Sequence, residues 1–168
     1  MKYKRLTFFT LLVALAGCGR GAPPVAEPSG TIVVADRLSN QRVNAFAEDA
    51  DGHIWIATSR GLNRFSVHEY HQYFSADDTL GLPDNQVNDV FRSSTGTIWA
   101  ATNSGVARLT SEGQFRYVPA PGRPNANHLW ETRDGKLLMS NSATLFQYDA
   151  EEDRFRPVVR DFNAYSYP

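Results

Sequence analysis

The chain has 168 residues, of which 42% are apolar, 12% aromatic and 21% charged, a composition typical of a globular protein. Its 17 Lys and Arg residues are balanced by 18 Asp and Glu residues, so it lacks the basic surplus that nucleic-acid-binding proteins usually carry. The single cysteine excludes an internal disulfide and any zinc or iron–sulfur site built from clustered cysteines.

The first segment, residues 1–17, is predicted to be an export signal. Three basic residues precede an apolar run from Leu6 to Ala16, which is too short to span a membrane as a helix. The run ends in Leu15-Ala16-Gly17-Cys18, which resembles the bacterial lipobox, where the cysteine thiol accepts a diacylglycerol and the peptide is cut before it. We therefore expect a lipoprotein signal peptide with lipidation at Cys18. The alternative is an ordinary signal peptide with an incidental cysteine.

Residues 18–30 are predicted to be a flexible linker. They are rich in Gly and Pro and contain no aromatic residue, so they bury too little apolar surface to offset the entropy of ordering. Gly19 is not the Asp that keeps lipoproteins of enteric bacteria at the inner membrane. We expect a protein that is lipid-anchored to the bacterial membrane and faces the periplasm, with the outer membrane as its site in a Gram-negative cell.

The remainder, residues 31–168, contains an internal repeat. Aligning Leu38–Tyr73 with Leu82–Tyr117, a period of 44, gives 11 identities in 36 positions, whereas ordinary residue usage would give roughly 2. A third, weaker copy follows 39 residues later and is anchored on Asp134-Gly135. A period of this length, with an aromatic residue and two glycines per copy, indicates the blades of a propeller.

Each copy predicts a run of short antiparallel strands. A hairpin dipeptide ending in Gly52, Gly96 or Gly135 lies between two apolar segments of each copy, and Gly61 and Gly105 mark the next turn of the first two. The strands that follow the first two dipeptides are apolar on both faces, which favours a sheet enclosed between two others.

We therefore predict an all-β fold, an incomplete β-propeller of about three four-stranded antiparallel blades, preceded by a signal-peptide helix and the linker. The expected blades are at about 38–80, 82–122 and 124–161.

The repeat resembles a known family. Val43-Asn44, Gly52, Ile54–Thr58, Gly61-Leu62 and Arg64 are similar to the two-component regulator propeller repeat, and the second copy is similar too. The third copy is degenerate and replaces the tryptophan by leucine. The resemblance implies an extracytoplasmic sensory domain, which in this family commonly precedes a membrane-linked histidine kinase, although other members are exported alone.

The blade count is low for a closed ring. From Leu38 onward the chain has room for three copies, whereas closed propellers typically have about 4–8 blades. The strand expected at 31–35 would complete the last blade of such a ring. We expect the leading portion of a longer protein or a truncated product, with self-association into a ring as the less favoured alternative. Residues 19–168 alone are then expected to aggregate or to unfold without a cooperative transition.

The residues that recur are interpreted as structural. Trp55 and Trp99 are expected to fill the space between blades rather than to stack on a ligand, because structural residues recur and ligand contacts usually do not. Arg64 and Arg108 are expected to tie adjacent strands by hydrogen bonds, with a partner-facing role as the alternative. The structural set comprises Trp55, Trp99, Gly52, Gly96, Gly61, Gly105, Arg64 and Arg108.

No metal site, cofactor or catalytic residue is predicted. Asp49-Ala50-Asp51-Gly52 is interpreted as a turn rather than a calcium loop, because an EF-hand loop needs Glu at its twelfth position and this chain has Arg60 there. His68 and His71 are spaced for a helix but lie in a strand-and-turn segment. Non-repeating polar residues are possible ligand contacts, with nothing to choose among them: His53, Arg60, Asn63 and Arg123.

Two functions follow from these features. The favoured one is a non-catalytic sensing or interaction module that binds a small molecule, a glycan or a partner such as a histidine kinase module, and not nucleic acid. The alternative is an enzyme like the streptogramin lyases, which are exported propellers with similar Gly-x-Ile-Trp strands. That enzyme would need a closed ring and a His/Glu pair at its centre.

Overall fold

The computed structural model describes residues 32–75, 80–122 and 124–160. Every helix-or-strand element in these ranges is a β-strand, and none of their residues forms a helix long and apolar enough to cross a membrane. The predicted signal peptide, the linker with Cys18, and Arg123 lie outside the described residues. The all-β prediction is confirmed for the repeat region.

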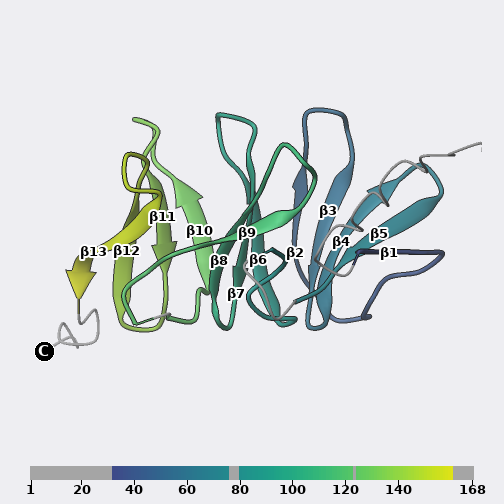
Figure 1. Ribbon diagram of the computed structural model, residues 1–168, viewed down its shortest axis with the longest axis horizontal. Helices are drawn as coiled ribbons and strands as arrows, with labels where there is room; N and C mark the ends of the chain where they lie inside the picture. Colours follow the sequence, from purple (N-terminus) through teal and green to yellow (C-terminus); the bar gives the residue numbers. More distant parts are fainter. Residues whose placement is uncertain (1–31, 76–79, 123, 161–168) are drawn as a thin grey trace, which may run out of the picture.

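Three antiparallel sheets stand side by side in a row, in chain order (Figure 1). Blade 1 contains β1 (Ile32–Ala35), β2 (Val43–Glu48), β3 (Ile54–Thr58), β4 (Gly61–Ser66) and β5 (Glu69–Tyr73). Blade 2 contains β6 (Val87–Arg92), β7 (Ile98–Thr102), β8 (Gly105–Leu109) and β9 (Phe115–Val118). Blade 3 contains β10 (His128–Glu131), β11 (Leu137–Ser140), β12 (Thr144–Asp149) and β13 (Arg154–Arg160). The sheets do not close into a ring, which confirms the prediction of an incomplete propeller.

The first strand is placed differently from the prediction. The strand expected to complete the last blade of a ring instead pairs antiparallel with β5, with Ile32 opposite Tyr73 and Ala35 opposite Tyr70. The chain before each of the other two blades also borders that blade's outer strand, since Gly81 N donates to Phe115 O at 2.6 Å and Phe155 N to Pro119 O at 2.7 Å. An exposed strand edge is therefore partly covered in every blade, and β1 does this over four residues.

Local hydrogen bonds explain why the turn between β3 and β4 of blade 1 recurs between β7 and β8 of blade 2. Thr58 Oγ1 donates to Gly61 O at 2.7 Å, and Thr102 Oγ1 donates to Gly105 O at 2.8 Å. Both threonine side chains are fully buried, so this bond satisfies their hydroxyl groups. In blade 3 the turn is held by Asn141, whose Oδ1 accepts from two backbone N–H groups instead.

Glycine at this turn is required by a close approach as well as by its backbone angle. Gly105 has φ of +120°, and a Cβ there would lie 2.7 Å from Cε2 of Tyr117. Gly61 has φ of +99°, with Phe74 Cε1 at 2.9 Å from the same position. A side chain at either residue would therefore meet both backbone strain and an aromatic ring.

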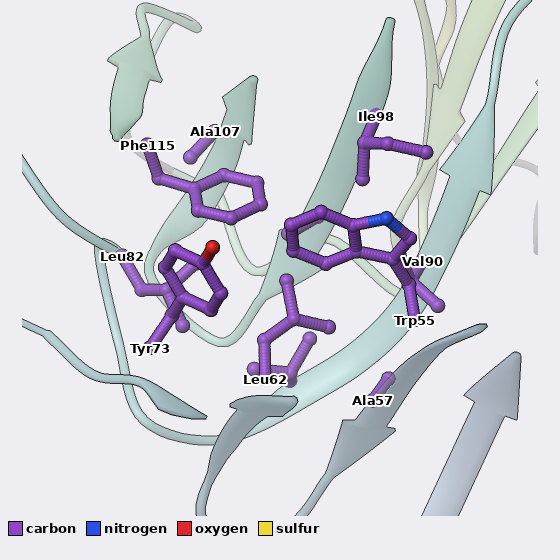
Figure 2. Packing of buried hydrophobic residues seen from close by; sticks show 11 residues of the cluster. Trp55, Ala57, Leu62, Tyr73, Leu82, Val90, Ile98, Ala107 and Phe115 are labelled. Atoms are coloured by element: carbon purple, nitrogen blue, oxygen red, sulfur yellow. The ribbon is translucent and has the colours of Figure 1, made fainter. Parts of the chain in front are cut away.

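An aromatic cluster fills the space between blades 1 and 2 (Figure 2). Trp55 is fully buried, and its ring lies 5.3 Å from that of Tyr73 in the same blade and 5.7 Å from that of Phe115 in the next. The contact with Phe115 is edge-on, the arrangement that aromatic quadrupoles favour. The tryptophan therefore lies between the blades.

The cluster between blades 2 and 3 also combines a tryptophan with two other rings. Its third ring comes from the following blade, whereas Tyr73 of the first cluster comes from the same blade as its tryptophan. Trp99 of blade 2 packs against Phe155 and Tyr148, both from blade 3, at centroid distances of 6.2 and 4.9 Å. Phe115 and Phe155 occupy equivalent places, because each lies at the start of the outer strand and pairs with the last residues of the strand before it. Blades 2 and 3 thus each pack one phenylalanine against the tryptophan of the blade before it.

The strand register corrects one match of the sequence repeat. Tyr73 is opposite Leu62 in blade 1, whereas the residue opposite the equivalent Val106 is Val118, not Tyr117. The turn before β9 is one residue longer, so Tyr73 and Tyr117 are identical in the alignment but not equivalent in space. Tyr70 of blade 1 takes the place of Phe115 and Phe155.

The two tryptophans differ in one contact that mutation can isolate. Trp55 Nε1 donates to Asp49 Oδ2 at 2.9 Å, whereas Trp99 Nε1 is buried and finds no acceptor among the described residues. Because both positions lose the same ring area on substitution, we expect Trp55→Phe to cost about 1–2 kcal/mol more than Trp99→Phe. Urea unfolding of the two variants measures this difference. Equal losses would contradict the assigned hydrogen bond.

Candidate functional site

Strands β2, β6 and β10, one in each blade, and the residues just before them bring amide side chains to one groove. Asn44, Asn88 and Asn127 each follow a small apolar residue at the start of, or just before, β2, β6 and β10. The groove has a volume of about 450 Å³. It is lined by Arg42, Val43, Asn44, Gln86, Asn88, Asn127 and His128.

Two of the three asparagines hold neighbouring blades together. Asn44 Nδ2 donates to Val87 O at 2.6 Å, and Asn88 Nδ2 donates to Ala126 O at 2.8 Å. Both bonds run from one blade to the first residues of the next, so they repeat along the row. Asn127 is the third member of the series: its Oδ1 accepts from Asn125 at 3.0 Å, and its Nδ2 donates to no described residue.

A carboxylate and an imidazole lie at one border of the groove. Asp89 Oδ2 accepts from Leu129 N at 2.9 Å, and His128 Nδ1 is 3.9 Å from the same oxygen. Burial raises the pKa of Asp89, while the backbone N–H groups of Leu129 and Val90 act against that rise. The side chain of His128 is 79% exposed, so its ring is available to a ligand.

The lining is mostly polar. Four of the seven lining residues are amides, which both donate and accept hydrogen bonds, and Arg42 and His128 add further polar groups. The single apolar lining residue is Val43. A ligand rich in hydroxyl groups offers donors and acceptors in the same dense arrangement.

The recurring arginines contact different partners from those expected. Arg108 Nη2 donates to Asp153 Oδ2 at 2.9 Å, so it ties blade 2 to blade 3 rather than neighbouring strands of one blade. The Arg64 guanidinium lies 5.8 Å from the Trp55 ring centroid, a cation–π contact. Arg64 does not form the equivalent ion pair because the second copy has Gly113 at the position of Asp153. Burial and a hydrogen bond to Asp153 raise the pKa of Tyr148 to about 12.

The acidic turn that follows β2 is held by internal hydrogen bonds. Asp49, Asp51 and His53 place possible ligand atoms within 4.8 Å of one another. The Asp49 carboxylate already accepts from Trp55 Nε1 and from the backbone N–H groups of Asp51 and His53. Burial alone would raise the pKa of Asp49, but these bonds outweigh it and lower that pKa overall. The contacts are those of a turn.

Of the non-repeating polar residues, the three that the structure describes, His53, Arg60 and Asn63, are not among the groove lining. His53 contacts Asp49 at 3.1 Å, Asn63 is buried against Ser39, and Arg60 lies exposed at the β3–β4 turn. His71 contacts Glu69 at 3.0 Å, and His68 is exposed. The sequence reasoning missed Arg42, Gln86, Asn127 and His128 as lining residues. The signal available was the asparagine that recurs at the start of each blade.

A scan of family models matches residues 37–60 and 81–104 to the two-component regulator propeller. Two stretches of this chain therefore match the two-component regulator propeller repeat. They correspond to the first two copies of the sequence repeat and cover the connecting segments, β2, β3, β6 and β7. The repeat assignment made from the sequence is therefore confirmed. No curated protein matches the chain.

Solved structures with the same fold include extracellular domains of two-component and one-component systems. The extracellular domain of a putative hybrid two-component system of B. thetaiotaomicron matches with a TM-score of 0.67 and 19% identity, over 82% of this chain and 22% of that one. That of a putative one-component system from the same organism matches at 0.62 and 20%, over 71% and 17%. This chain thus spans about a fifth of the length of these two structures.

An enzyme shares the fold as well. Virginiamycin B lyase from Staphylococcus aureus matches with a TM-score of 0.57 and 17% identity, over 76% of this chain and 45% of that one. Identities this low establish a common fold and nothing about activity.

The position of Asp89 predicts a pH dependence. An acid whose pKa is raised by folding favours the folded state when protonated, so its contribution is complete below the unfolded value of 3.8 and is lost as pH rises through the folded pKa. Relative to Asp89→Asn, the unmodified chain should therefore gain stability as pH falls from neutral toward that value. Urea midpoints across this range test the trend, with Asp51→Asn at an exposed turn as control. A gap between chain and variant that does not change with pH would contradict it.

Proposed function

We propose that this chain is an exported, lipid-anchored sensing module of the two-component regulator type, which binds a small polar molecule or a glycan without chemically changing it. The observation that carries the proposal is the amide-lined groove where the first strands of all three blades meet. The match to the two-component regulator propeller, and the shared fold with extracellular domains of two-component and one-component systems, support a sensory role.

The groove chemistry favours a polyhydroxylated ligand. Amide side chains cannot change their charge near neutral pH, so they recognise hydroxyl groups by direction and spacing rather than by charge. Arg42 and His128 stand at exposed positions of the lining and can donate to ligand oxygens without breaking an inter-blade bond. The two inter-blade asparagines instead fix the width of the groove.

The anchor and the signalling partner complete the proposal. Cys18 is proposed to carry the lipid that holds the propeller at the membrane, facing the periplasm, with the outer membrane as its site in a Gram-negative cell. A histidine kinase module or another signalling protein is the proposed recipient of the signal. Each of these elements extends beyond the described residues.

A binding experiment tests the groove. The full chain is titrated calorimetrically with a panel of neutral oligosaccharides, and we expect at least one to bind. Arg42→Ala and His128→Ala should each weaken that binding about tenfold, since each removes a hydrogen-bonding group worth about 1.4 kcal/mol. Arg37→Ala is the matched control, because Arg37 is equally cationic and exposed but lies outside the groove lining.

Two outcomes would overturn the binding proposal. One is that no member of the panel binds. The other is that Arg37→Ala weakens binding as much as Arg42→Ala does, because the effect would then arise from net charge. Quinupristin is the compound present in a crystal structure of an inactive virginiamycin B lyase with the same fold, so incubation with it tests the enzymatic alternative. An unchanged chromatographic profile of quinupristin is expected, and its conversion to a new product would favour a lyase.

The anchor is tested by changing the cysteine. Expressed in a bacterium, the chain should partition into the detergent phase of a Triton X-114 extraction, and Cys18→Ser should move it into the aqueous phase because no thiol remains to accept the lipid. Gly19→Ser, one residue further on, should leave partitioning unchanged. Equal partitioning of the chain and Cys18→Ser would contradict lipidation.

A further inference from the structure

We propose that a second copy of this chain docks head to tail on this one, with the outer face of its blade 1 packed against the outer face of blade 3. The two faces at the ends of the row are the sides of blades 1 and 3 that point away from blade 2 (Figure 1). This interaction surface goes beyond the proposed sensing function and does not depend on it.

Each outer face exposes a large aromatic side chain. On blade 1, Phe46 is 66% exposed, and the cross-strand register places it on one face with Ile56 and Asn63. On blade 3, Trp130 is 67% exposed and shares a face with Leu138. Exposed aromatic residues of this size on a sheet face mark a surface that gains free energy when a partner covers it.

The two outer faces are equivalent to the two sides of the interfaces already present. Leu138 occupies the repeat position of Trp55 and Trp99, which are both buried against the following blade. On the receiving side, Tyr70 occupies the position of Phe115 and Phe155, which pack on those tryptophans. Blade 3 therefore has a face equivalent to the tryptophan side of an interface, with no blade packed on it among the described residues. Blade 1 has a face equivalent to the phenylalanine side, with no tryptophan packed on it among those residues.

The sizes of the side chains on the two faces compensate. Trp55 is received by a cluster that includes Val90, Ala100 and Ala107 (Figure 2). At the equivalent positions blade 1 has the larger Phe46, Ile56 and Asn63. Asn63 is already buried against Ser39 of its own chain and Ile56 is 8% exposed, so Phe46 is the member of this set that is open to an incoming side chain. The corresponding residue on blade 3 is the smaller Leu138. The exposed Phe46 of one copy would thus meet the smaller Leu138 of the other at the place where a tryptophan docks on the next blade, which favours close packing there.

The hydrogen-bond series also continues across the proposed contact. Asn44 donates to the carbonyl of Val87, and Asn88 donates to that of Ala126, each at the entry of the next blade. The next donor in the series is Asn127, whose Nδ2 has no acceptor among the described residues. The equivalent acceptor is the carbonyl of Val43 in the second copy. One polar group of each face would thus find its partner in the other.

Docking would also extend the groove. Asn127 and His128 lie at the blade 3 end of the groove, and Arg42 to Asn44 lie at its blade 1 end. A second copy would place its own Arg42 beside Asn127, which continues the same lining across the contact.

Sedimentation of the full chain and three variants over a hundredfold range of concentration tests the proposal. The unmodified chain should associate as concentration rises, whereas Trp130→Glu and Phe46→Glu should each weaken association at least tenfold, since each places a carboxylate in an apolar contact. Val34→Glu is the matched control: Val34 is 57% exposed on the outermost strand and points to the opposite face from Phe46. Circular dichroism should show the same strand content in all four proteins.

Mixing the variants distinguishes head-to-tail docking from other contacts. Trp130→Glu keeps an intact blade 1 face and Phe46→Glu keeps an intact blade 3 face, so an equimolar mixture should form a two-copy species that neither variant forms alone. A monomer at every concentration would overturn the proposal. So would a loss caused by Trp130→Glu alone, which indicates two blade 3 faces in contact, or an equal loss caused by Val34→Glu, which indicates pairing of outer strand edges.

Discussion

The packing of aromatic rings between neighbouring blades is the interaction on which the rest of the structure depends. The central strands of each blade are apolar on both faces, so a single blade would leave one or both faces in water. Trp55 and Phe115 resolve this for blades 1 and 2, and Trp99 and Phe155 for blades 2 and 3. Stability therefore accumulates from interface to interface rather than within a blade, as in other repeat proteins.

This dependence explains which features could be predicted from the sequence. The turn glycines, the buried threonines and the tryptophans are fixed by contacts within one repeat or with its neighbour, so they recur at the repeat period. The register of β9 could not be predicted, because one extra residue in a turn shifts Val118 into the place of Tyr73 while the letters still align. The partner of β1 also depends on which outer edge is free in space, and no local pattern encodes that.

The candidate groove was missed for a related reason. The recurrence of Asn44 and Asn88 correctly indicates a structural role, since both bond to the backbone of the next blade. The same recurrence places one amide per blade along a common line, so a structural series also forms a polar surface. Arg42 and His128 add to it only because the first strands converge, and they have no shared position in the repeat. Recurrence separates structural from functional residues poorly at the ends of propeller strands.

The polar groove and the apolar outer faces would suit different partners, because water hydrogen-bonds well to the groove and poorly to the outer faces. Water can hydrogen-bond to the groove amides, so a ligand there must replace those bonds with others of matching geometry. This gives selectivity at a modest net gain in binding free energy. The outer faces carry Phe46 and Trp130, whose burial gains free energy with little demand on direction. Their specificity must therefore come from shape, and the repeat supplies it, because every blade carries a version of the same two sides. On the proposed docking, a surface of that kind would bind another blade in preference to an unrelated protein.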